Sequence, residues 1–375
     1  MKSNSSRTGS RPSRKTARNE LSPDEWPGEI AAIDTLFAKA GLVRSLRGKA
    51  SQRDRPARLD RAAPEELTRP AGEPRLAPNG VKWLPVPGFD FPWLWSGFST
   101  RRGGLSRAYC ADDAPGEMNL GFTADDLREA VEGNRRLLAE AVSGDSATPL
   151  IALRQFHSNC VVRATRADAE RARPCRADGQ ITDEPGMLLA VQTADCIPVL
   201  VADRKRRAVG AFHAGWRGTV RRIVEAGVGR MRLEFGSRPE DLVAAIGPGI
   251  GACCYAVGEE VLTEFESQFH YARALFHEVF SSDAVKSKYP MLFLTQRAPG
   301  HSTVGPSLHV DLAEANRQQL LSAGLKPRAI RVVGGCTQCN PELYFSHRGS
   351  QGRAGRMMAV IGVRKGARNR SASGN

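Results

Sequence analysis

The sequence lacks any apolar run that approaches the roughly 20 residues of a membrane-spanning helix. Residues 1–20 are basic and serine-rich but contain no apolar segment, so they do not resemble a secretory signal. We interpret them as a disordered basic segment. With 41% hydrophobic and 25% charged residues in 375, the chain can bury a substantial core. We therefore expect a cytoplasmic protein with no membrane partner.

A dense basic stripe is also missing, although positive charge is abundant. The net charge is +14, and residues 1–80 hold 16 Lys and Arg against 10 Asp and Glu. The rest of the excess is spread over residues 81–375. A protein that follows a phosphate backbone needs a concentrated basic surface. We therefore predict no nucleic-acid partner, while a basic pocket for a small anionic substrate stays open.

The eight cysteines do not form a pattern typical of a disulfide framework. Such cysteines in a long chain without a secretory signal are more often reduced, buried or metal-binding. Cys336 and Cys339 form a CxxC motif, but the sequence has no second CxxC, because Cys253 and Cys254 are adjacent. We predict a packed loop at this motif rather than a zinc knuckle.

Strand and helix patterns alternate over the body of the chain and show no internal repeat. They predict an α/β (α+β) fold in which mixed central β-sheets are flanked by helices, in a single catalytic domain spanning residues 81–365. Residues 1–80 are expected to be a disordered basic extension with one possible helix at 23–49. Residues 366–375 are expected to be a disordered tail.

Individual segments carry clear periodicity. Helices are predicted at 125–142, 219–236, 257–269 and 310–324. The nearly continuous apolar run at 187–203 predicts a central strand covered on both faces, and 151–157 and 160–165 predict a hairpin or strand pair. Further strands are predicted at 93–100, 208–216, 242–251, 329–335, 342–348 and 357–363.

Two histidines and one cysteine lie at the ends of predicted core strands: His157, Cys196 and His213. Imidazole and thiolate are preferred zinc ligands, and three protein ligands leave one coordination position open. We predict that these residues form a catalytic zinc site, with Asp195 orienting a ligand histidine. Because they come from separate segments, spacing alone also allows ordinary packed histidines and an inert cysteine.

Two arginines are candidates for anion binding. Arg101 precedes two glycines in FSTRRGGLS, which suits an anion cradle or an ordinary turn. Arg217 precedes a predicted helix, where it could meet a phosphate together with free backbone N–H groups. Alternatively, Arg217 stacks on Trp216 at the surface.

Several segments in order resemble the laccase-domain family, formerly called multicopper polyphenol oxidases and now regarded as zinc-dependent purine nucleoside phosphorylases. The resemblance spans residues 97–363 or so and rests on FSTRRGGLS, MNLGF, EGNRRLL, QFH, DGQITDEPGMLLAVQTADCIPVLVAD, AFHAGWRGTV, IGPGIGACCYAVGEEV, VDLAEANRQQL and CTQCNPELYFSHR. The pairing of TADC with HAGWRG is its most specific part.

The resemblance implies that the zinc ligands are His157, Cys196 and His213, which are also the catalytic residues. Arg101, Asn119 and Arg217 are the residues we expect to bind substrate. The implied activities are phosphorolysis of adenosine, inosine, guanosine and methylthioadenosine, and deamination of adenosine.

The sequence departs from the family pattern at a few positions. Ser158 stands where the family usually has Gly, and His347-Arg348-Gly349 where it usually has Tyr-Arg-Arg. Residues 270–305 are expected to be a local insertion or an altered loop.

Other functions remain open from the sequence. A copper-dependent polyphenol oxidase needs several coppers with mostly imidazole ligands, whereas the chain has seven histidines and no His-x-His. Cys196 activated by His213 could instead be the nucleophile of a hydrolase. A non-catalytic partner-binding module is a further alternative.

Overall fold

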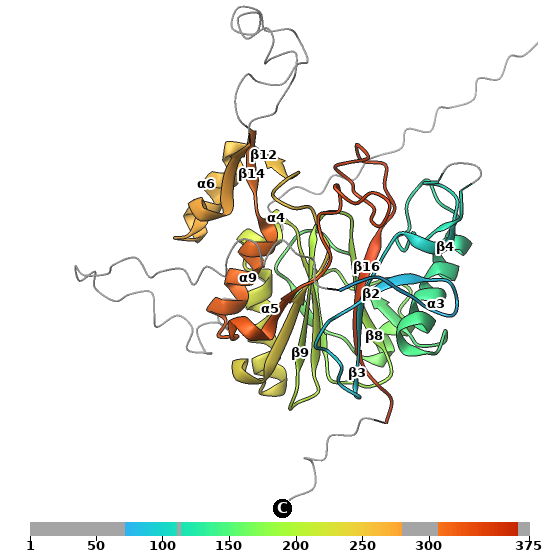
Figure 1. The fold of residues 1–375 in the computed structure, drawn as a ribbon. Coiled ribbons are helices and arrows are strands. Elements are labelled where there is room, and N and C mark those ends of the chain that lie inside the picture. Colours follow the sequence, from blue (N-terminus) through green and yellow to red (C-terminus); the bar gives the residue numbers. More distant parts are fainter. Residues whose placement is uncertain (1–71, 111–113, 280–306, 367–375) are drawn as a thin grey trace, which may run out of the picture. The chain divides into compact units, whose positions relative to one another are not determined.

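The computed structural model describes residues 72–110, 114–279 and 307–366 and contains two six-stranded sheets and one three-stranded sheet (Figure 1). The first sheet has the strand order β1-β2-β3-β16-β8-β5. Its strands are β1 (Arg75–Leu76), β2 (Lys82–Pro85), β3 (Leu94–Ser99), β16 (Met357–Val363), β8 (Leu188–Thr193) and β5 (Leu150–Ala152).

The second sheet has the order β15-β11-β9-β10-β7-β6. Its strands are β15 (Ile330–Val332), β11 (Leu242–Ile246), β9 (Ile197–Asp203), β10 (Val209–Ala214), β7 (Gly179–Thr182) and β6 (Val161–Arg163). The small sheet joins β12 (Ala256–Val257), β14 (Ser307–Val310) and β13 (Phe276–Val279), and β4 (Arg102–Ser106) is bridged to Glu117.

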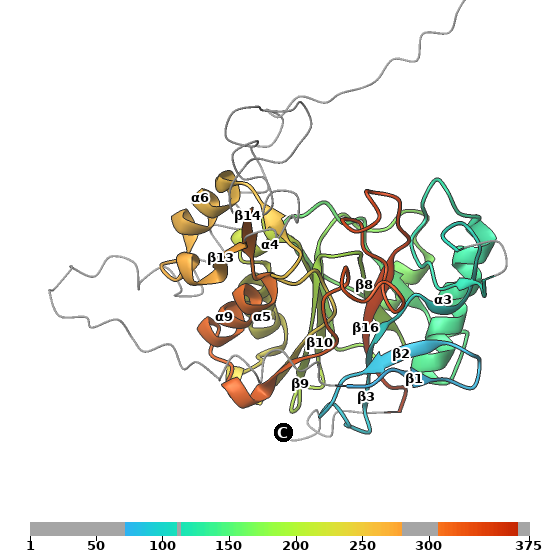
Figure 2. The same ribbon diagram turned by 45° about the horizontal axis from the view of Figure 1, so that its top comes forward.

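Helices cover the outer faces of the two large sheets. In Figures 1 and 2, α3 lies beside β8 and β16, while α5 and α9 lie on the opposite side, next to β9 and β10. The α-helices of the described residues are α3 (Arg128–Ser143), α4 (Trp216–Val220), α5 (Ile223–Phe235), α6 (Glu259–Gln268) and α9 (Leu312–Ser322). Layers that alternate in this way let each sheet bury both of its faces.

The alternation of side chains along β9 explains this layering. Val199 and Val201 belong to the core cluster that includes α5 and α9, whereas Leu200 and Ala202 belong to the cluster shared with the first sheet. Every residue of β9 is buried. The sequence of a strand whose two faces are both covered is therefore a continuous apolar run.

The fold class and most predicted elements are confirmed, but the predicted strand at 187–203 is wrong. It is two strands, β8 and β9, which belong to different sheets. The chain leaves the first sheet after Thr193 and enters the second at Ile197. Only the tertiary structure distinguishes two buried strands from one, because both are equally apolar. The break between them contains Cys196.

Three smaller differences have similar causes. The segments at 151–157 and 160–165 do not pair with each other, because β5 pairs with β8 and β6 with β7. The helix predicted at 219–236 is divided at Arg222, whose φ of 61° is incompatible with a continuous helix. The segment 342–348 forms turns rather than a strand.

Some expectations fall outside the described residues, namely the helix at 23–49 and most of the segment 270–305. β1, which lies within 1–80, pairs antiparallel with β2 and so belongs to the first sheet. Among the described residues, no helix combines the length and apolar character needed to cross a membrane.

Candidate metal centre

Cys196 and His213 meet because β9 and β10 are antiparallel neighbours. Their register pairs Ala214 with Ile197 and His213 with Pro198. Cys196 immediately precedes Ile197, so its thiol lies at the same end of the sheet as the His213 ring. His213 is 4% exposed, and Cys196 is half-buried.

His157 reaches the same point from the loop between β5 and β6. Its φ is 62°, a left-handed conformation that a non-glycine residue adopts only when its surroundings hold it there. The backbone N–H of His157 donates to Asp178 Oδ1 at 3.0 Å, and that of Ser158 donates to Asp178 Oδ2 at 2.7 Å. The loop therefore turns around a buried carboxylate.

Asp178 also orients His213. The Nδ1–H of His213 donates to Asp178 Oδ1 at 2.9 Å, which directs Nε2 toward the cluster. Burial raises the pKa of Asp178, but hydrogen bonds from His213 and Ser158 outweigh this effect and lower it to about 2. A carboxylate that holds a ligand imidazole in one tautomer is a typical support of a metal site.

The prediction that Asp195 orients a ligand histidine is therefore wrong, since Asp178 does so. Asp195 instead accepts hydrogen bonds at 2.6 Å from Thr337 Oγ1 and at 2.6 Å from the backbone N–H of Arg348. Asp178 escaped the sequence analysis, although an Asp-Gly pair directly before a buried strand was a usable signal.

The ligand atoms of His157, Cys196 and His213 lie within 4.8 Å of one another. Cys196 Sγ is 3.8 Å from His157 Nε2, and the two imidazole centroids are 5.0 Å apart. Ligands about 2.0–2.3 Å from a tetrahedral zinc ion are separated by roughly 3.5 Å. The donor set and its spacing therefore fit one such ion.

Gly215 closes one side of this cluster. A Cβ atom at this position would lie 2.8 Å from Cys196 Sγ and 2.8 Å from His157 Cδ2. Since such contacts are too short, only glycine lets the chain pass so near the three ligands.

The thiol of Cys196 is acidic in this environment. Burial raises its pKa, but the charge of His213 and the hydrogen bond with His157 outweigh this effect and lower it to about 6. For His213, burial lowers the pKa, whereas the charge of Cys196 and the hydrogen bond with Asp178 raise it to about 9. The lowered pKa favours the thiolate form of Cys196, which is the form that binds metals and attacks electrophiles.

Basic and aromatic side chains surround the cluster. Arg221 donates to the backbone carbonyl of His157 at 3.2 Å. Arg217 stacks on the Trp216 ring at 4.5 Å, and Arg348 on Tyr255 at 5.2 Å. Burial raises the pKa of Tyr255 to about 12, Cys196 adds to the rise, and the charges of Arg348 and Arg217 oppose it. The stacking considered for Arg217 is present, yet its side chain stays exposed near the cluster.

Arg101 and Asn119 are not part of this cluster. The Arg101 guanidinium forms an ion pair with the buried Glu117 at 2.6 Å and lies 4.7 Å above the Phe345 ring. The Asn119 side chain has no exposed surface and bonds to Gly121, Asp126 and the backbone of Arg356. In this conformation both side chains are occupied by intramolecular contacts.

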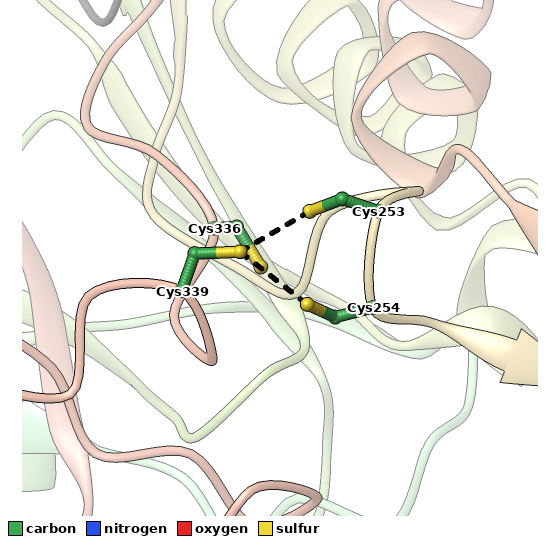
Figure 3. Close-up of side chains that lie close together, drawn as sticks. All are labelled: Cys253, Cys254, Cys336 and Cys339. Atoms are coloured by element: carbon green, nitrogen blue, oxygen red, sulfur yellow. Dashed lines mark hydrogen bonds between the residues drawn. The ribbon is translucent and has the colours of Figure 1, made fainter. Parts of the chain in front are cut away.

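A second cluster of possible metal ligands consists of Cys253, Cys254, Cys336 and Cys339, whose sulfurs lie within 4.8 Å of one another (Figure 3). The CxxC motif is therefore not isolated, because Cys253 and Cys254 lie beside it, and the prediction of a packed loop stays a prediction. Adjacent cysteines from a remote segment complete the set, which sequence spacing could not indicate.

Known proteins resemble this chain over most of its length. Purine nucleoside phosphorylase YlmD of Geobacillus stearothermophilus is 34% identical over 292 residues, which cover 76% of this chain and 95% of that protein. A purine nucleoside phosphorylase of Deinococcus radiodurans is 35% identical over 285 residues, 76% of this chain and 94% of that protein.

The fold is also that of a solved structure, the hypothetical protein YfiH of Bacillus licheniformis. The TM-score is 0.62 at 30% identity, and the match covers 78% of this chain and 99% of that one. The model of the multi-copper polyphenol oxidoreductase laccase family matches residues 95–364. The chain therefore belongs to this family, as the resemblance of its motifs implied.

Proposed function

We propose that the protein is a zinc-dependent purine nucleoside phosphorylase that also deaminates adenosine. The convergence of His157, Cys196 and His213 within 4.8 Å carries the proposal. Such a donor set suits zinc and leaves one coordination position for substrate or water. The names of the relatives in Geobacillus and Deinococcus support the phosphorylase activity.

When bound, zinc would supply a Lewis acid at the point where the three ligand side chains meet. The protein's own part is to fix the three ligands in position. Asp178 accepts hydrogen bonds from the backbone of His157 and from the ring of His213. Because the carboxylate is buried and fully hydrogen-bonded, both histidines stay oriented through a catalytic cycle.

Phosphorolysis requires that phosphate attack C1′ of the ribose while the bond from C1′ to the purine nitrogen breaks. The products are the free base, which takes up a proton, and the 1-phosphate of the substrate's sugar, which is ribose or, for methylthioadenosine, methylthioribose. A phosphate dianion needs positive charge near the ribose. Arg217 and Arg348 can provide it, since their charges act on Tyr255 beside Cys196. Adenosine, inosine, guanosine and methylthioadenosine share the bond that breaks and are the proposed substrates.

Deamination uses water in place of phosphate and acts on the base. Water adds to C6 of adenine, and ammonia leaves, so that adenosine becomes inosine. Zinc deaminases perform this reaction with other ligand motifs. The same open coordination position would serve both reactions, which therefore compete for one site.

The direct test is a nucleoside panel assayed with and without phosphate on purified protein. We expect free base and ribose 1-phosphate to appear only with phosphate, to disappear on chelation and to return with zinc. Base release at the same rate without phosphate would contradict phosphorolysis. The Cys175→Ser variant, altered at a thiol outside both clusters, is the matched control for Cys196→Ser.

The two predicted anion-binding arginines can be separated in the same assay. The Arg217→Ala variant should raise the KM for phosphate and leave folding stability within about 0.5 kcal/mol of the unchanged protein. The Arg101→Ala variant leaves the buried Glu117 carboxylate unpaired, so its main effect should be a stability loss of about 3–5 kcal/mol. A larger phosphate KM change in Arg101→Ala than in Arg217→Ala would reverse this assignment.

Copper-dependent phenol oxidation is less well supported. The two ligand clusters that the described ranges contain have only two imidazoles between them, both in one cluster. A four-electron oxidase needs several coppers with mostly imidazole ligands. Oxygen consumption at full copper loading, with an intense blue absorbance, would favour the oxidase instead.

A cysteine-nucleophile hydrolase is favoured by one observation, the lowered pKa of Cys196 beside His213. That chemistry needs a free thiolate and no metal. Activity that survives chelation and is abolished by a thiol-alkylating reagent would support the hydrolase. Protection of Cys196 from the reagent by zinc, together with activity that requires zinc, would support the phosphorylase.

A further inference from the structure

Two loops that are far apart in the sequence bring the four-cysteine cluster together. One follows β11 and carries Cys253 and Cys254, and the other follows β15 and carries Cys336 and Cys339. β11 and β15 are parallel neighbours, so both loops leave the same edge of the second sheet. A backbone bridge between Gly249 and Cys336 then joins them.

The sulfur positions fit a single centre. The Sγ atom of Cys339 lies 3.5 Å from that of Cys253 and 3.4 Å from that of Cys254. Four sulfurs about 2.3 Å from a tetrahedral zinc ion are roughly 3.8 Å apart. Figure 3 shows the side chains of the two loops pointing toward one another. Cys339 Sγ is about equally far from the sulfurs of both adjacent cysteines, as a shared ion would place it. A disulfide would instead bring it close to only one of them.

The surrounding backbone lets the two loops approach closely. A Cβ at Gly251 would lie 3.2 Å from Cys253 Sγ and 3.2 Å from Cys336 Cβ. Glycine at this position therefore allows the two loops to approach within ligand distance. Asn340 also donates to the Cys336 carbonyl at 2.8 Å, which holds the CxxC turn closed.

We propose that Cys253, Cys254, Cys336 and Cys339 bind one thiophilic divalent cation, zinc above all, at a second site separate from His157, Cys196 and His213. Four thiolates complete a tetrahedral coordination sphere and leave no open position, so the ion has a structural role. Binding releases the thiol protons to solvent and clamps the two loops together.

The clamped loops support the first centre through Asp195. Thr337, next to Cys336, donates to the Asp195 side chain at 2.6 Å. Ile250, in the other loop, donates its backbone N–H to the Asp195 carbonyl at 2.8 Å. Asp195 has a φ of 90° and directly precedes Cys196. The ion would thus hold in place the strained residue that aims the Cys196 thiol.

The test is to count zinc in the full-length protein. The protein is loaded with zinc under anaerobic conditions, desalted and analysed by elemental mass spectrometry. We expect the Cys336→Ser/Cys339→Ser variant to hold one zinc fewer than the unchanged protein, whereas the Cys175→Ser control keeps the full count. An unchanged count in the double variant would overturn the proposal. Because the result is a difference, it does not depend on whether the first centre binds zinc.

Cobalt substitution identifies the ligands without relying on the folding of the double variant. In a Cys196→Ser protein loaded with Co²⁺, we expect an intense sulfur-to-cobalt charge-transfer band from four thiolates. A band with the intensity of a single thiolate, or none, would overturn the proposal. So would an anaerobic protein whose intact mass lacks two hydrogens and whose peptides link Cys339 to Cys253 or Cys254.

Discussion

The centre formed by His157, Cys196 and His213 and the four-cysteine cluster differ in what supports them. In the first, Cys196 and His213 lie at the ends of neighbouring strands of the second sheet, and the fully buried carboxylate of Asp178 bonds to His213 and to the loop that carries His157. The second is carried by two loops, and two of its thiols are exposed. Asp178 thus fixes the two histidines of the first centre, whereas the cysteines of the second are placed by the two loops that carry them.

This difference is the one expected between a site that reacts and a site that stabilises. A mixed set of three ligands with an orienting carboxylate leaves a coordination position for substrate. Four thiolates fill the coordination sphere of an ion, so such a site cross-links the chain and offers no position to a substrate. Asp195 connects the two, since both cysteine loops bond to it and it precedes Cys196. The following variants test this difference between the two clusters.

The largest effect is expected for Cys196→Ala. It removes a ligand from the open site, so phosphorolysis should fall by about 100- to 1,000-fold or more. The matched Cys339→Ala variant should lose less than about tenfold, because it acts on the centre only through Asp195. The two losses are compared by measuring turnover of inosine with phosphate in both variants. Equal losses would show that the two clusters form one functional unit.

Cys336→Ser should act on stability rather than turnover. An ion that binds only the folded chain contributes about 2.7 kcal/mol when its free concentration is 100 times the Kd. Thermal unfolding of Cys196→Ser protein, whose first centre lacks a ligand, should therefore show a zinc-dependent rise in Tm that the additional Cys336→Ser change largely removes. Cys175→Ser should keep the rise. If Cys336→Ser retained it as well, the stabilising role of the cluster would be refuted.

Asp178→Asn should weaken zinc binding at the first centre by about 10- to 100-fold. Asparagine preserves the shape but removes the charge that holds His157 and His213. Competition with a zinc-binding dye measures the change. The control is Asp183→Asn, whose partly exposed ion pair with Arg163 contributes little. Cobalt bound by the four cysteines should keep its spectrum, and a changed spectrum would show that the two sites are coupled.

The smallest expected effect belongs to one of two glycines that lie beside the clusters. Gly215→Ala would place its Cβ 2.8 Å from Cys196 Sγ and should cost about 1–3 kcal/mol of zinc affinity at the first centre. Gly251→Ala, whose Cβ would lie at a less close 3.2 Å from Cys253 Sγ and Cys336 Cβ, should cost less than about 1 kcal/mol at the second.

Gly229→Ala in α5 is the control for both glycine variants, because a Cβ there meets nothing within 4 Å. It should stabilise the fold slightly and leave both metal affinities unchanged. A greater loss for Gly251→Ala than for Gly215→Ala would mean that the loops are more rigid than the strand ends.

Much of the fold was predictable because local patterns agree with it. The amphipathic period of α3 and the short apolar runs of β3, β10 and β16 each indicate the correct element. The errors occur where the chain changes partners. The apolar run at 187–203 contains two strands of different sheets, and an unbroken apolar pattern does not show where the chain crosses between them.

The candidate metal centre shows the same division. His157, Cys196 and His213 were recognisable from residue type and their places at strand ends, and the family motifs supported them. Asp178 was missed because its role depends on hydrogen bonds to segments on either side of it, from His157 to His213. Arg101 was predicted to bind an anion, but its pairing with Glu117 is visible only in three dimensions.

By itself, the sequence determined the fold class, because periodicity is a local property of the chain, and its motifs indicated the family and, through it, the three residues of the first centre. Only the tertiary structure decided which carboxylate holds the histidines and that four cysteines share one place. Those relations depend on which strands become neighbours, as β11 and β15 do. Strand pairing is set by the packing of the whole core rather than by any one segment.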